Sequence, residues 1–426
     1  MTVVIFAVTL FSAMALGLPI AFSLLVCGAA LMVTQGQIDT TILSQKLVEG
    51  ADSFPLLAIP FFMLAGELMN AGGISKRIVN FALAWVGHLR GGLGIVAIFA
   101  SVVMAAISGS AAAEAAALGA LRIPMMRKAG YNIPRASGLI AAGGVIAPVI
   151  PPSIGLIVFG VIANVSIGKL FMAGIVPGLL MGLALLTTWL WVARKDKVSV
   201  LPKQNMGARL RAGVDGIWAL LMPVGIIGGM KFGLFTPTEA GVAACVYAFV
   251  VGVFIYRELP LRQVYGILVS AAKSTSVVVF LIAAALVSAW LITTSDVPEQ
   301  VAALLQPFTG NTTLLMLVIM LLVVIVGTAL DFAPTLMILT PVLMPVVREA
   351  GIDPVYFGVL FIMNNAIGLI TPPVGTVLNV VAGVGKMKMD EVTRGVIPFM
   401  TAQFTIMFLL VLFPSLVTVP AKWFAG

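Results

Sequence analysis

Charged residues are scarce in this chain. Of its 426 residues only 9% are Asp, Glu, Lys or Arg, while 61% are hydrophobic. A soluble domain has about 25% charged residues, so the composition excludes an ordinary soluble fold. The net charge of +8 comes without any Lys/Arg-rich run and without interleaved aromatic and basic residues. It therefore indicates loop charges that set membrane orientation, and we expect no nucleic-acid partner.

The residues of common catalytic and metal sites are also scarce. A single histidine cannot supply the two ligands of a bis-histidine haem, which argues against a cytochrome subunit. Cys27 and Cys245 lie in apolar runs and are expected to be small buried side chains without a disulfide. The phosphate-binding pattern G-x-x-x-x-G-K-S/T does not occur, and neither does a catalytic triad. We predict that the chain is not an enzyme and uses no cofactor.

Long apolar runs are abundant. Many exceed the roughly 18 residues that indicate a membrane helix, which predicts an all-α polytopic membrane protein. No positive charge or clear cleavage site marks a signal peptide, so the first span is expected to be uncleaved. We expect membrane segments over residues 3–33 (broken at Gly17-Leu18-Pro19), 55–72, 136–165, 170–193, 214–234, 237–256, 263–294, 355–384 and 396–418. A polar stretch over 35–53, an amphipathic helix over 75–89 capped by Ser75 and a short surface helix over 298–308 complete the prediction.

A Pro-Pro pair interrupts two of these segments, and the two copies are in register. Pro151-Pro152 matches Pro372-Pro373 at an offset of 221, and the same offset aligns several other residues without a gap. These pairs are Pro124 and Pro345, Arg127 and Arg348, Ala129 and Ala350, Gly130 and Gly351, Gly174 and Gly395, and Pro177 and Pro398. Such self-similarity predicts an internal duplication. We divide the chain into a first repeat (1–193), a cytoplasmic linker (194–213) and a second repeat (214–426).

Each repeat also has an apolar segment that is too long for one span and too short for two. These segments, 92–126 and 312–347, have small residues at their centres. A re-entrant helical hairpin fits that length, because non-helical backbone at this depth is tolerated where it is buried in protein or lines a cavity. Each repeat is thus expected to pair one hairpin with one Pro-broken helix, over 136–165 and 355–384.

The distribution of Lys and Arg predicts how the two repeats are oriented. If the linker is cytoplasmic, 19 of the 24 Lys and Arg residues lie inside and both termini lie outside. The first hairpin then opens from the cytoplasm and the second from the outside. Inverted repeats of this kind are typical of secondary transporters of the elevator type.

The helix breaks predict ion sites. Pro lacks an N–H and displaces the preceding turn, so a broken helix leaves carbonyl oxygens that can bind Na⁺. The first Na⁺ site is predicted from Ser108, Ser110, Gly144, Pro148 and Pro151. The second is predicted from Gly327, Thr328, Asp331, Asn365, Thr371 and Thr376. The N-terminal ends of the half-helices suit a carboxylate. An organic anion is expected between the two tips, near Ser110, Pro152, Ser153, Asn364, Pro373 and Thr376. The alternative is that the Pro kinks and small residues only shape helix packing.

Five polar residues at apolar depth have alternative interpretations. Glu67, Glu114 and Asp331 are functional candidates, although helix-end or interfacial positions would also explain Glu67 and Glu114. Asn364 and Asn365 stand where the first repeat has Gly143 and Gly144. Their amide oxygens could bind an ion or substrate, or they could only hydrogen-bond a neighbouring helix.

Several longer motifs resemble one family. The strings FPLLAIPFFMLAGELMNAGGISKRI, SGSAAAEAAALGAL, IPPSIGLIVFG, GLFTPTEAG and GLITPPVGTVLNV are similar to the large membrane subunit of tripartite ATP-independent periplasmic (TRAP) transporters. The resemblance implies an elevator-type fold related to the divalent-anion symporters, with a scaffold and a moving transport domain. It also implies Na⁺-driven uptake of a dicarboxylate, sialic acid or sugar acid across the bacterial inner membrane. Its implied partners are a small four-helix membrane subunit, expected to be a separate chain, a periplasmic substrate-binding protein and membrane lipids. The Ser-Asn-Thr tips of the divalent-anion symporters are absent here.

Two other functions compete with this one. A self-sufficient Na⁺/anion symporter would transport without a binding protein. A channel or an assembly scaffold for other membrane proteins would show uptake without a Na⁺ gradient, or no uptake.

Overall fold

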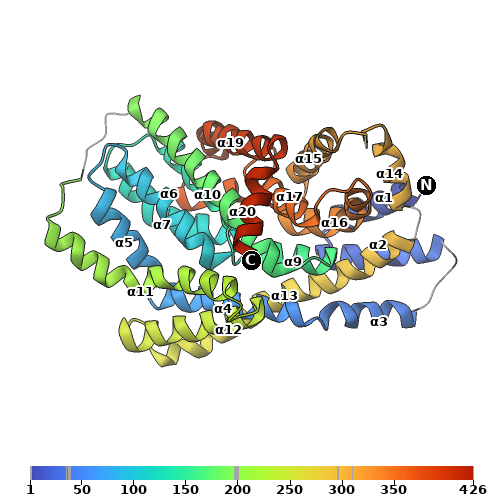
Figure 1. The fold of residues 1–426 in the computed structure, drawn as a ribbon, viewed down its shortest axis with the longest axis horizontal. Helices are drawn as coiled ribbons and strands as arrows, with labels where there is room; N and C mark the ends of the chain where they lie inside the picture. The colour runs from blue at the N-terminus through green and yellow to red at the C-terminus, as the bar shows by residue number, and fades with distance from the viewer. Residues whose placement is uncertain are drawn as a thin grey trace.

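The computed structural model describes residues 2–34, 36, 40–195, 201–294, 297–308 and 310–425, and these residues form helices joined by short connections (Figure 1). The first half contains α1 (Thr2–Ala15), α2 (Ile20–Thr34), α3 (Thr40–Ala51), α4 (Ala58–Ala71), α5 (Ile74–Val86), α6 (Gly92–Ser108), α7 (Ala111–Lys128), α8 (Ile133–Gly144), α9 (Ile154–Ala163) and α10 (Ile167–Val192). The second half contains α11 (Met206–Lys231), α12 (Pro237–Val250), α13 (Leu261–Thr294), α14 (Val297–Leu305), α15 (Thr312–Ala329), α16 (Phe332–Glu349), α17 (Pro354–Gly368), α18 (Thr376–Gly385), α19 (Met389–Leu412) and α20 (Ser415–Ala425).

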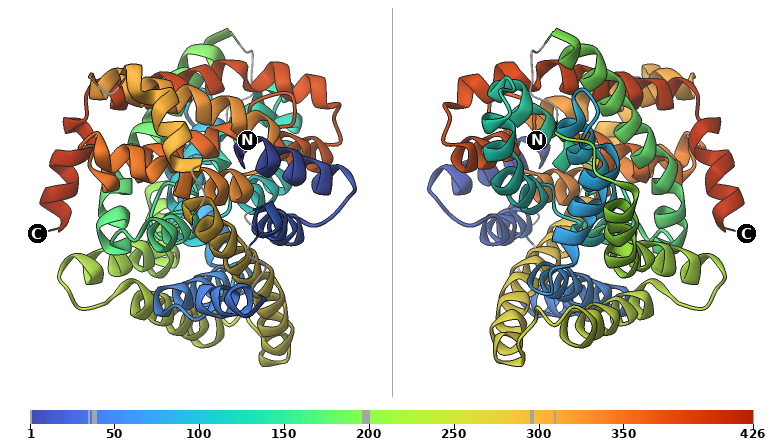
Figure 2. Two further views of the ribbon diagram at one scale, coloured as in Figure 1. Left: turned by 90° about the vertical axis from the view of Figure 1, so that its right-hand side faces the viewer. Right: turned by 90° about the vertical axis from the view of Figure 1, so that its left-hand side faces the viewer.

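The helices form a long row beneath a compact upper body (Figures 1 and 2). The row contains α2, α3, α4, α11, α12 and α13, with α12 packed on α4 and the long α13 packed on α2, α3 and α4. In the upper body α19 packs on α8, α18 on α7 and α10 on both α19 and α20. The row meets the body where α13 contacts α16, and α5 joins them by packing on both α11 and α6.

Apolar length is sufficient for several membrane spans. Seven helices in the described part of the chain are long and apolar enough to cross a membrane, and further apolar helices of 10–17 residues accompany them. The seven begin at Phe54, Ile167, Met206, Pro237, Leu261, Phe332 and Met389. Exposed hydrophobic side chains are frequent on this surface, as a lipid environment requires. The predicted all-α fold of a multi-pass membrane protein is confirmed.

Both halves contain the same order of local structures. After α7 and α16, Gly130 and Gly351 turn the chain with positive φ values of 81° and 69°. Asn132 and Asp353 then cap α8 and α17 by accepting hydrogen bonds from backbone N–H groups. Both Pro-Pro bonds that follow are cis. The inverted relation of the two halves across a membrane stays a prediction.

The register of the two copies changes by one residue after the Pro-Pro pair. The helix α9 starts at Ile154 and α18 at Thr376, which is an offset of 222 rather than 221. The additional residue lies beside Gly375, which caps α18 with a φ of 50°. The gapless alignment predicted from the sequence is therefore wrong at this point, because the second loop contains one residue more.

Several predicted boundaries also differ from the structure. The polar stretch 35–53 contains α3, an amphipathic helix with its apolar side on α13. The linker 194–213 is shorter than predicted, since α11 begins at Met206 after its cap Asn205; residues 196–200 lie outside the described residues. The last span, predicted over 396–418, is instead α19, and the separate helix α20 follows it.

The structure fixes the helix boundaries of the first apolar run and of the predicted amphipathic helix. Residues 3–33 form two helices, α1 and α2, rather than one broken helix. Ser75 does not cap α5, because Gly73 occupies that position with a φ of 74°. Ser75 instead donates a hydrogen bond to Asn70. The buried face of α5 packs on α6 and α11.

Candidate functional site

The connection between α6 and α7 lies against the first Pro-Pro break. Gly109 turns the chain with a φ of 59°, and Ser110 caps α7 by accepting a hydrogen bond from the Ala113 N–H at 3.4 Å. A Cβ on Gly109 would lie 3.5 Å from the Pro152 carbonyl oxygen. A Cβ on Gly144 would lie 2.7 Å from the Ala111 carbonyl oxygen. Glycine at both positions thus lets the helix tip reach the broken helix α8–α9.

The connection between α15 and α16 lies against the second break in the same way. Gly327 of α15 and Gly368 of α17 touch through their backbones, since a Cβ on Gly368 would be 3.1 Å from the Gly327 carbonyl oxygen. The Asn365 Nδ2 donates to the Phe332 carbonyl at 2.7 Å. The Thr376 Oγ1 donates to the Asp331 Oδ1 at 3.2 Å. Two hydrogen bonds and a close approach of two glycines therefore join this tip to its break.

Each break contains a run of backbone carbonyls that lack a hydrogen-bond donor. In the described residues, the carbonyl oxygens of 149–152 and of 370–373 accept no hydrogen bond from any other protein group. These two runs occupy equivalent positions at an offset of 221. An unpaired carbonyl at membrane depth is costly, so these oxygens need a partner such as a cation. The Val149 carbonyl faces Gly174 of α10, whereas the Pro152 carbonyl faces Gly109 of the first tip. Na⁺ binding by the carbonyls of either break stays a prediction.

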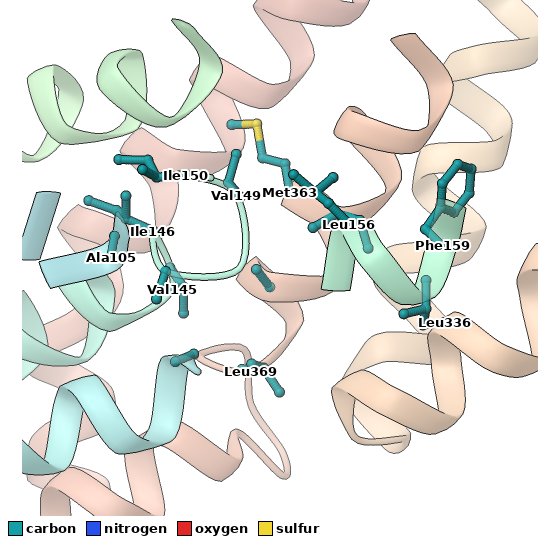
Figure 3. Packing of buried hydrophobic residues seen from close by; sticks show 14 of the residues in the cluster. Ala105, Val145, Ile146, Val149, Ile150, Leu156, Phe159, Leu336, Met363 and Leu369 are labelled. Carbon is teal, nitrogen blue, oxygen red and sulfur yellow. The ribbon is translucent and has the colours of Figure 1, made fainter. Parts of the chain in front are cut away.

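Hydrophobic packing holds the first break in place. Val149 and Ile150 of the loop lie near Met363 of α17, and Leu156 and Phe159 follow on α9 (Figure 3). All of residues 141–153 are buried. The Ser153 Oγ donates to the Pro148 carbonyl at 2.5 Å and accepts from the Leu156 N–H, so it both closes the loop and caps α9.

A cavity of about 300 Å³ lies between the two tips. The first residues of four helices line it: Ala111 of α7, Ile154 of α9, Phe332 of α16 and Thr376 of α18. Helix N-termini carry partial positive charge and free N–H groups, so this convergence suits an anion. Asp331 is the charged residue among the described residues that line the cavity.

The structure places the predicted site residues in three groups. Four of them line the cavity: Ser110, Pro148, Asp331 and Thr376. Others belong to the tips and breaks but do not line the cavity: Gly144, Pro151, Pro152, Ser153, Gly327 and Asn365. The remaining predicted residues do not line the cavity, and most of their side chains bond elsewhere. The Thr328 hydroxyl donates to a carbonyl of its own helix α15, and the Thr371 hydroxyl donates to a carbonyl of the preceding helix α17. The Asn364 amide donates to the Met320 carbonyl, and Pro373 is exposed. The side chain of Ser108 lies outside the described part of the structure.

The buried amides retain unused acceptors. Asn364 and Asn365 are each 1% exposed, and the Oδ1 atom of each has no hydrogen-bond partner. A helix–helix hydrogen bond, the simpler interpretation from sequence, is present for both Nδ2 groups. That hydrogen bond does not explain why the two amide oxygens are buried without a donor. The Asn365 Oδ1 lies beside Gly327 of the second tip.

The two acidic candidates outside the tips have different environments. Glu67 is half-buried on α4 and accepts a hydrogen bond from Ser270 at 3.0 Å, as a structural residue would. Glu114 is 1% exposed on the first turn of α7. Sequence reasoning overlooked Arg122, which is fully buried two turns further along α7. It also overlooked Phe332 and Leu369, whose apolar side chains line the cavity and carried no sequence signal.

Comparison with known proteins decides the family. Residues 7–416 match the family described as "Tripartite ATP-independent periplasmic transporter, DctM component". The chain belongs to this family. Its relatives are transport permeases, which agrees with the prediction of a non-enzymatic membrane protein.

Curated relatives cover nearly the whole chain. It is 54% identical to the "2,3-diketo-L-gulonate TRAP transporter large permease protein YiaN" of Escherichia coli K12, over 99% of this chain and 100% of the relative. It is 39% identical to the "Sialic acid TRAP transporter large permease protein SiaM" of Vibrio cholerae, over 96% of both chains. The fold is similar to that of the Alcanivorax borkumensis YdaH transporter, with a TM-score of 0.64 at 16% identity over 91% of this chain and 89% of that one.

Proposed function

We propose that this chain is the membrane permease of a Na⁺-coupled importer that carries a small organic acid across the bacterial inner membrane. The observation that supports this most is the convergence of four helix N-termini on one cavity, which Pro148 and Leu369 of the two breaks also line. The N-termini favour the carboxylate of the acid, and the carbonyls favour Na⁺. Binding the anion and the cations close together lowers the cost of moving either one through lipid.

The second break offers the more complete Na⁺ site. The carbonyls of 370–373 would be joined there by Asn365 Oδ1, which is buried and unpartnered, and by Asp331 and Thr376. The first break would use the carbonyls of 149–152 with Ser110. Hard cations take oxygen ligands of these kinds.

The membrane arrangement and movement are part of the proposal. With 19 of 24 Lys and Arg residues inside, both termini lie in the periplasm and the α6–α7 and α15–α16 pairs are re-entrant from opposite sides. The upper body would move as the transport domain past the row that contains α13, which would serve as the scaffold (Figure 1). Such rigid-body movement would expose the cavity alternately on each side, as in an elevator.

The partners and the acid follow from the family. We propose a small four-helix membrane subunit and a periplasmic binding protein as partners, with lipid around the complex. Relatives are named for 2,3-diketo-L-gulonate, sialic acid and C4-dicarboxylates. The relative at 54% identity is the one named for diketogulonate, so a sugar acid is the substrate class that we favour.

Reconstitution tests this function. Proteoliposomes containing both membrane subunits should take up labelled 2,3-diketo-L-gulonate only with an inward Na⁺ gradient and with the binding protein present. A thermal-shift screen of the binding protein against sialic acid, C4-dicarboxylates and other sugar acids would identify a different acid to use instead. Uptake without the binding protein would favour a self-sufficient symporter, and uptake without Na⁺ would refute the coupling.

Asp331 supplies a sharper variant of the same test. Asp331→Asn should raise the Na⁺ concentration that half-saturates uptake by about tenfold, because the variant loses a charged ligand at the second break. Asp353→Asn is the matched control, since Asp353 caps α17 away from the cavity. An unchanged Na⁺ dependence in Asp331→Asn would contradict a role for this carboxylate.

A further inference from the structure

A second cavity lies along three of the helices that line the one between the tips. It has a volume of about 580 Å³ and lies between α3 and α13 on one side and α9 and α16 on the other. Three helices line both cavities in succession. On α13 the lining residues change from Leu281 to Leu286, on α9 from Val158 to Ile162, and on α16 from Met337 to Pro341. Four or five residues are about 6–8 Å of helix, so the two cavities are neighbours along one seam.

The second cavity differs from the first in its charge. Its lining includes two cations, Lys46 of α3 and Arg348 of α16, and one carboxylate, Glu49 of α3. The amide of Asn164 also lines it. The Arg348 Nη2 donates to the Ala163 carbonyl at 2.6 Å, which fixes the guanidinium at the end of α9. Lys46 pairs with Glu49 at 2.6 Å, but both side chains are partly exposed. Such a surface pair is weak, so an incoming carboxylate can replace Glu49 at Lys46.

The position of these cations suits an acid that arrives from outside. Lys46 and Arg348 are two of the five Lys and Arg residues that the predicted topology places outside. A fixed guanidinium presents paired N–H donors that match a carboxylate. The remaining lining is largely apolar and includes Trp290 and Met344, which suits a small organic molecule rather than an inorganic ion alone.

We infer that this cavity is an antechamber in which Arg348 and Lys46 bind the carboxylate of an organic acid before the acid enters the cavity between the tips. The inference rests on the proposed function for the direction of travel. The binding itself depends only on the cavity and its two cations.

The first repeat provides a matched control for Arg348. The Arg127 Nη2 donates to the Gly385 carbonyl at 2.9 Å, at the end of α18, as Arg348 does at the end of α9. Arg127 is not among the residues that line the antechamber. Arg127→Gln and Arg348→Gln therefore remove the same kind of helix-end hydrogen bond, while Arg348→Gln alone removes a cation from the cavity.

Thiol protection tests the antechamber directly. Cys27 and Cys245, the two native cysteines, are replaced by alanine, and Thr293→Cys places a reporter in the cavity lining. The purified chain is treated with a small anionic thiosulfonate in the presence of increasing gluconate. Gluconate should slow the modification, and Arg348→Gln should raise the half-protecting concentration by about tenfold. Arg127→Gln should leave it unchanged, and Arg348→Lys should lie between the two.

The result is independent of transport because the assay needs no gradient. Absence of protection in the chain with native Arg348, or equal protection in Arg348→Gln and Arg127→Gln, would overturn the antechamber even if Na⁺-driven uptake is observed. Protection that depends on Arg348 would support it even if the uptake experiment fails. In the uptake assay, Arg348→Gln should raise KM by about tenfold and change the maximal rate by less than about twofold.

Discussion

Asn365 has one half of its amide satisfied and the other half free. Its Nδ2 holds the Phe332 carbonyl, while its buried Oδ1 has no partner in the protein. An unsatisfied buried acceptor costs about 1–3 kcal/mol, so a structural role alone does not explain why an amide is present. A cation at the second break would satisfy this oxygen.

Asn365→Ala should therefore weaken Na⁺ binding. We expect the half-saturating Na⁺ concentration for uptake to rise by about tenfold, as loss of one ligand implies. Gln403→Leu is the control, because Gln403 of α19 is also buried with a free Oε1, but its Nε2 bonds Met181 of α10 rather than a residue of either tip. Equal Na⁺ dependence in the two variants would remove Asn365 from the site.

The cap of α9 links helix stability to the geometry of the break. Ser153 closes the Pro148 loop and caps α9, whereas Ser166 caps α10 without contacting a break. Replacing either serine by alanine should cost about 1 kcal/mol, measurable as a lower unfolding temperature in detergent. Only Ser153→Ala should also lower Na⁺-driven uptake, since it frees the loop that carries the 149–152 carbonyls. A similar loss of uptake in Ser166→Ala would mean that stability alone is responsible.

At the scale of elements, close contact between α8 and α19 holds the first broken helix. A Cβ on Gly138 would collide with the backbone of Gly395, and a Cβ on Gly395 would collide with the Pro134 carbonyl. Small residues let membrane helices approach in this way, and packing rather than water exclusion then stabilises them.

Gly395→Ala should consequently destabilise the protein by about 1–3 kcal/mol, because backbone atoms cannot move aside as a side chain can. Thermal unfolding in detergent would measure this. Gly383→Ala on α18 is the control, as its Cβ would meet nothing within 4 Å, and alanine in a helix is favoured over glycine by up to about 1 kcal/mol. Equal unfolding temperatures for the two variants would contradict the tight contact.

At the scale of the whole molecule, the seam between α13 and the pair α9 and α16 separates the row from the upper body. Both cavities lie along it. If the body moves past the row, a covalent bridge across this seam must stop transport, while a bridge inside the body must not.

A pair of cross-links would measure this movement. Leu281→Cys with Met337→Cys, joined by a short bismaleimide, bridges the seam beside the cavity between the tips. Ser137→Cys with Met387→Cys lies within the body, where the Ser137 Oγ contacts the Met387 sulfur at 3.2 Å. We expect the first bridge to abolish uptake and the second to preserve most of it. Full uptake with the seam bridged would rule out the elevator movement.

Much of the fold could be predicted from local patterns. Most helices and both breaks could be located from the apolar runs, the two Pro-Pro pairs and the Gly turns. The reason is that the missing N–H of proline and the positive φ of glycine change the backbone only within a few residues. The prediction failed where distant packing decides. The stretch that forms α3 is too polar to be predicted as a packed helix, and its apolar side is buried because α13 covers it. The extra residue at Gly375 became evident only when the starts of α9 and α18 were known.

The sequence by itself determined the class of molecule, the positions of the two breaks and the family to which the chain belongs. Only the tertiary structure decided that four helix starts meet at one cavity and that Asn365 has a free oxygen beside the second tip. It also decided that a second cavity with Arg348 lies along the same helices. The physical reason is range. Backbone conformation follows from neighbouring residues, but a binding site consists of groups that are far apart in the chain and become neighbours only when the helices pack.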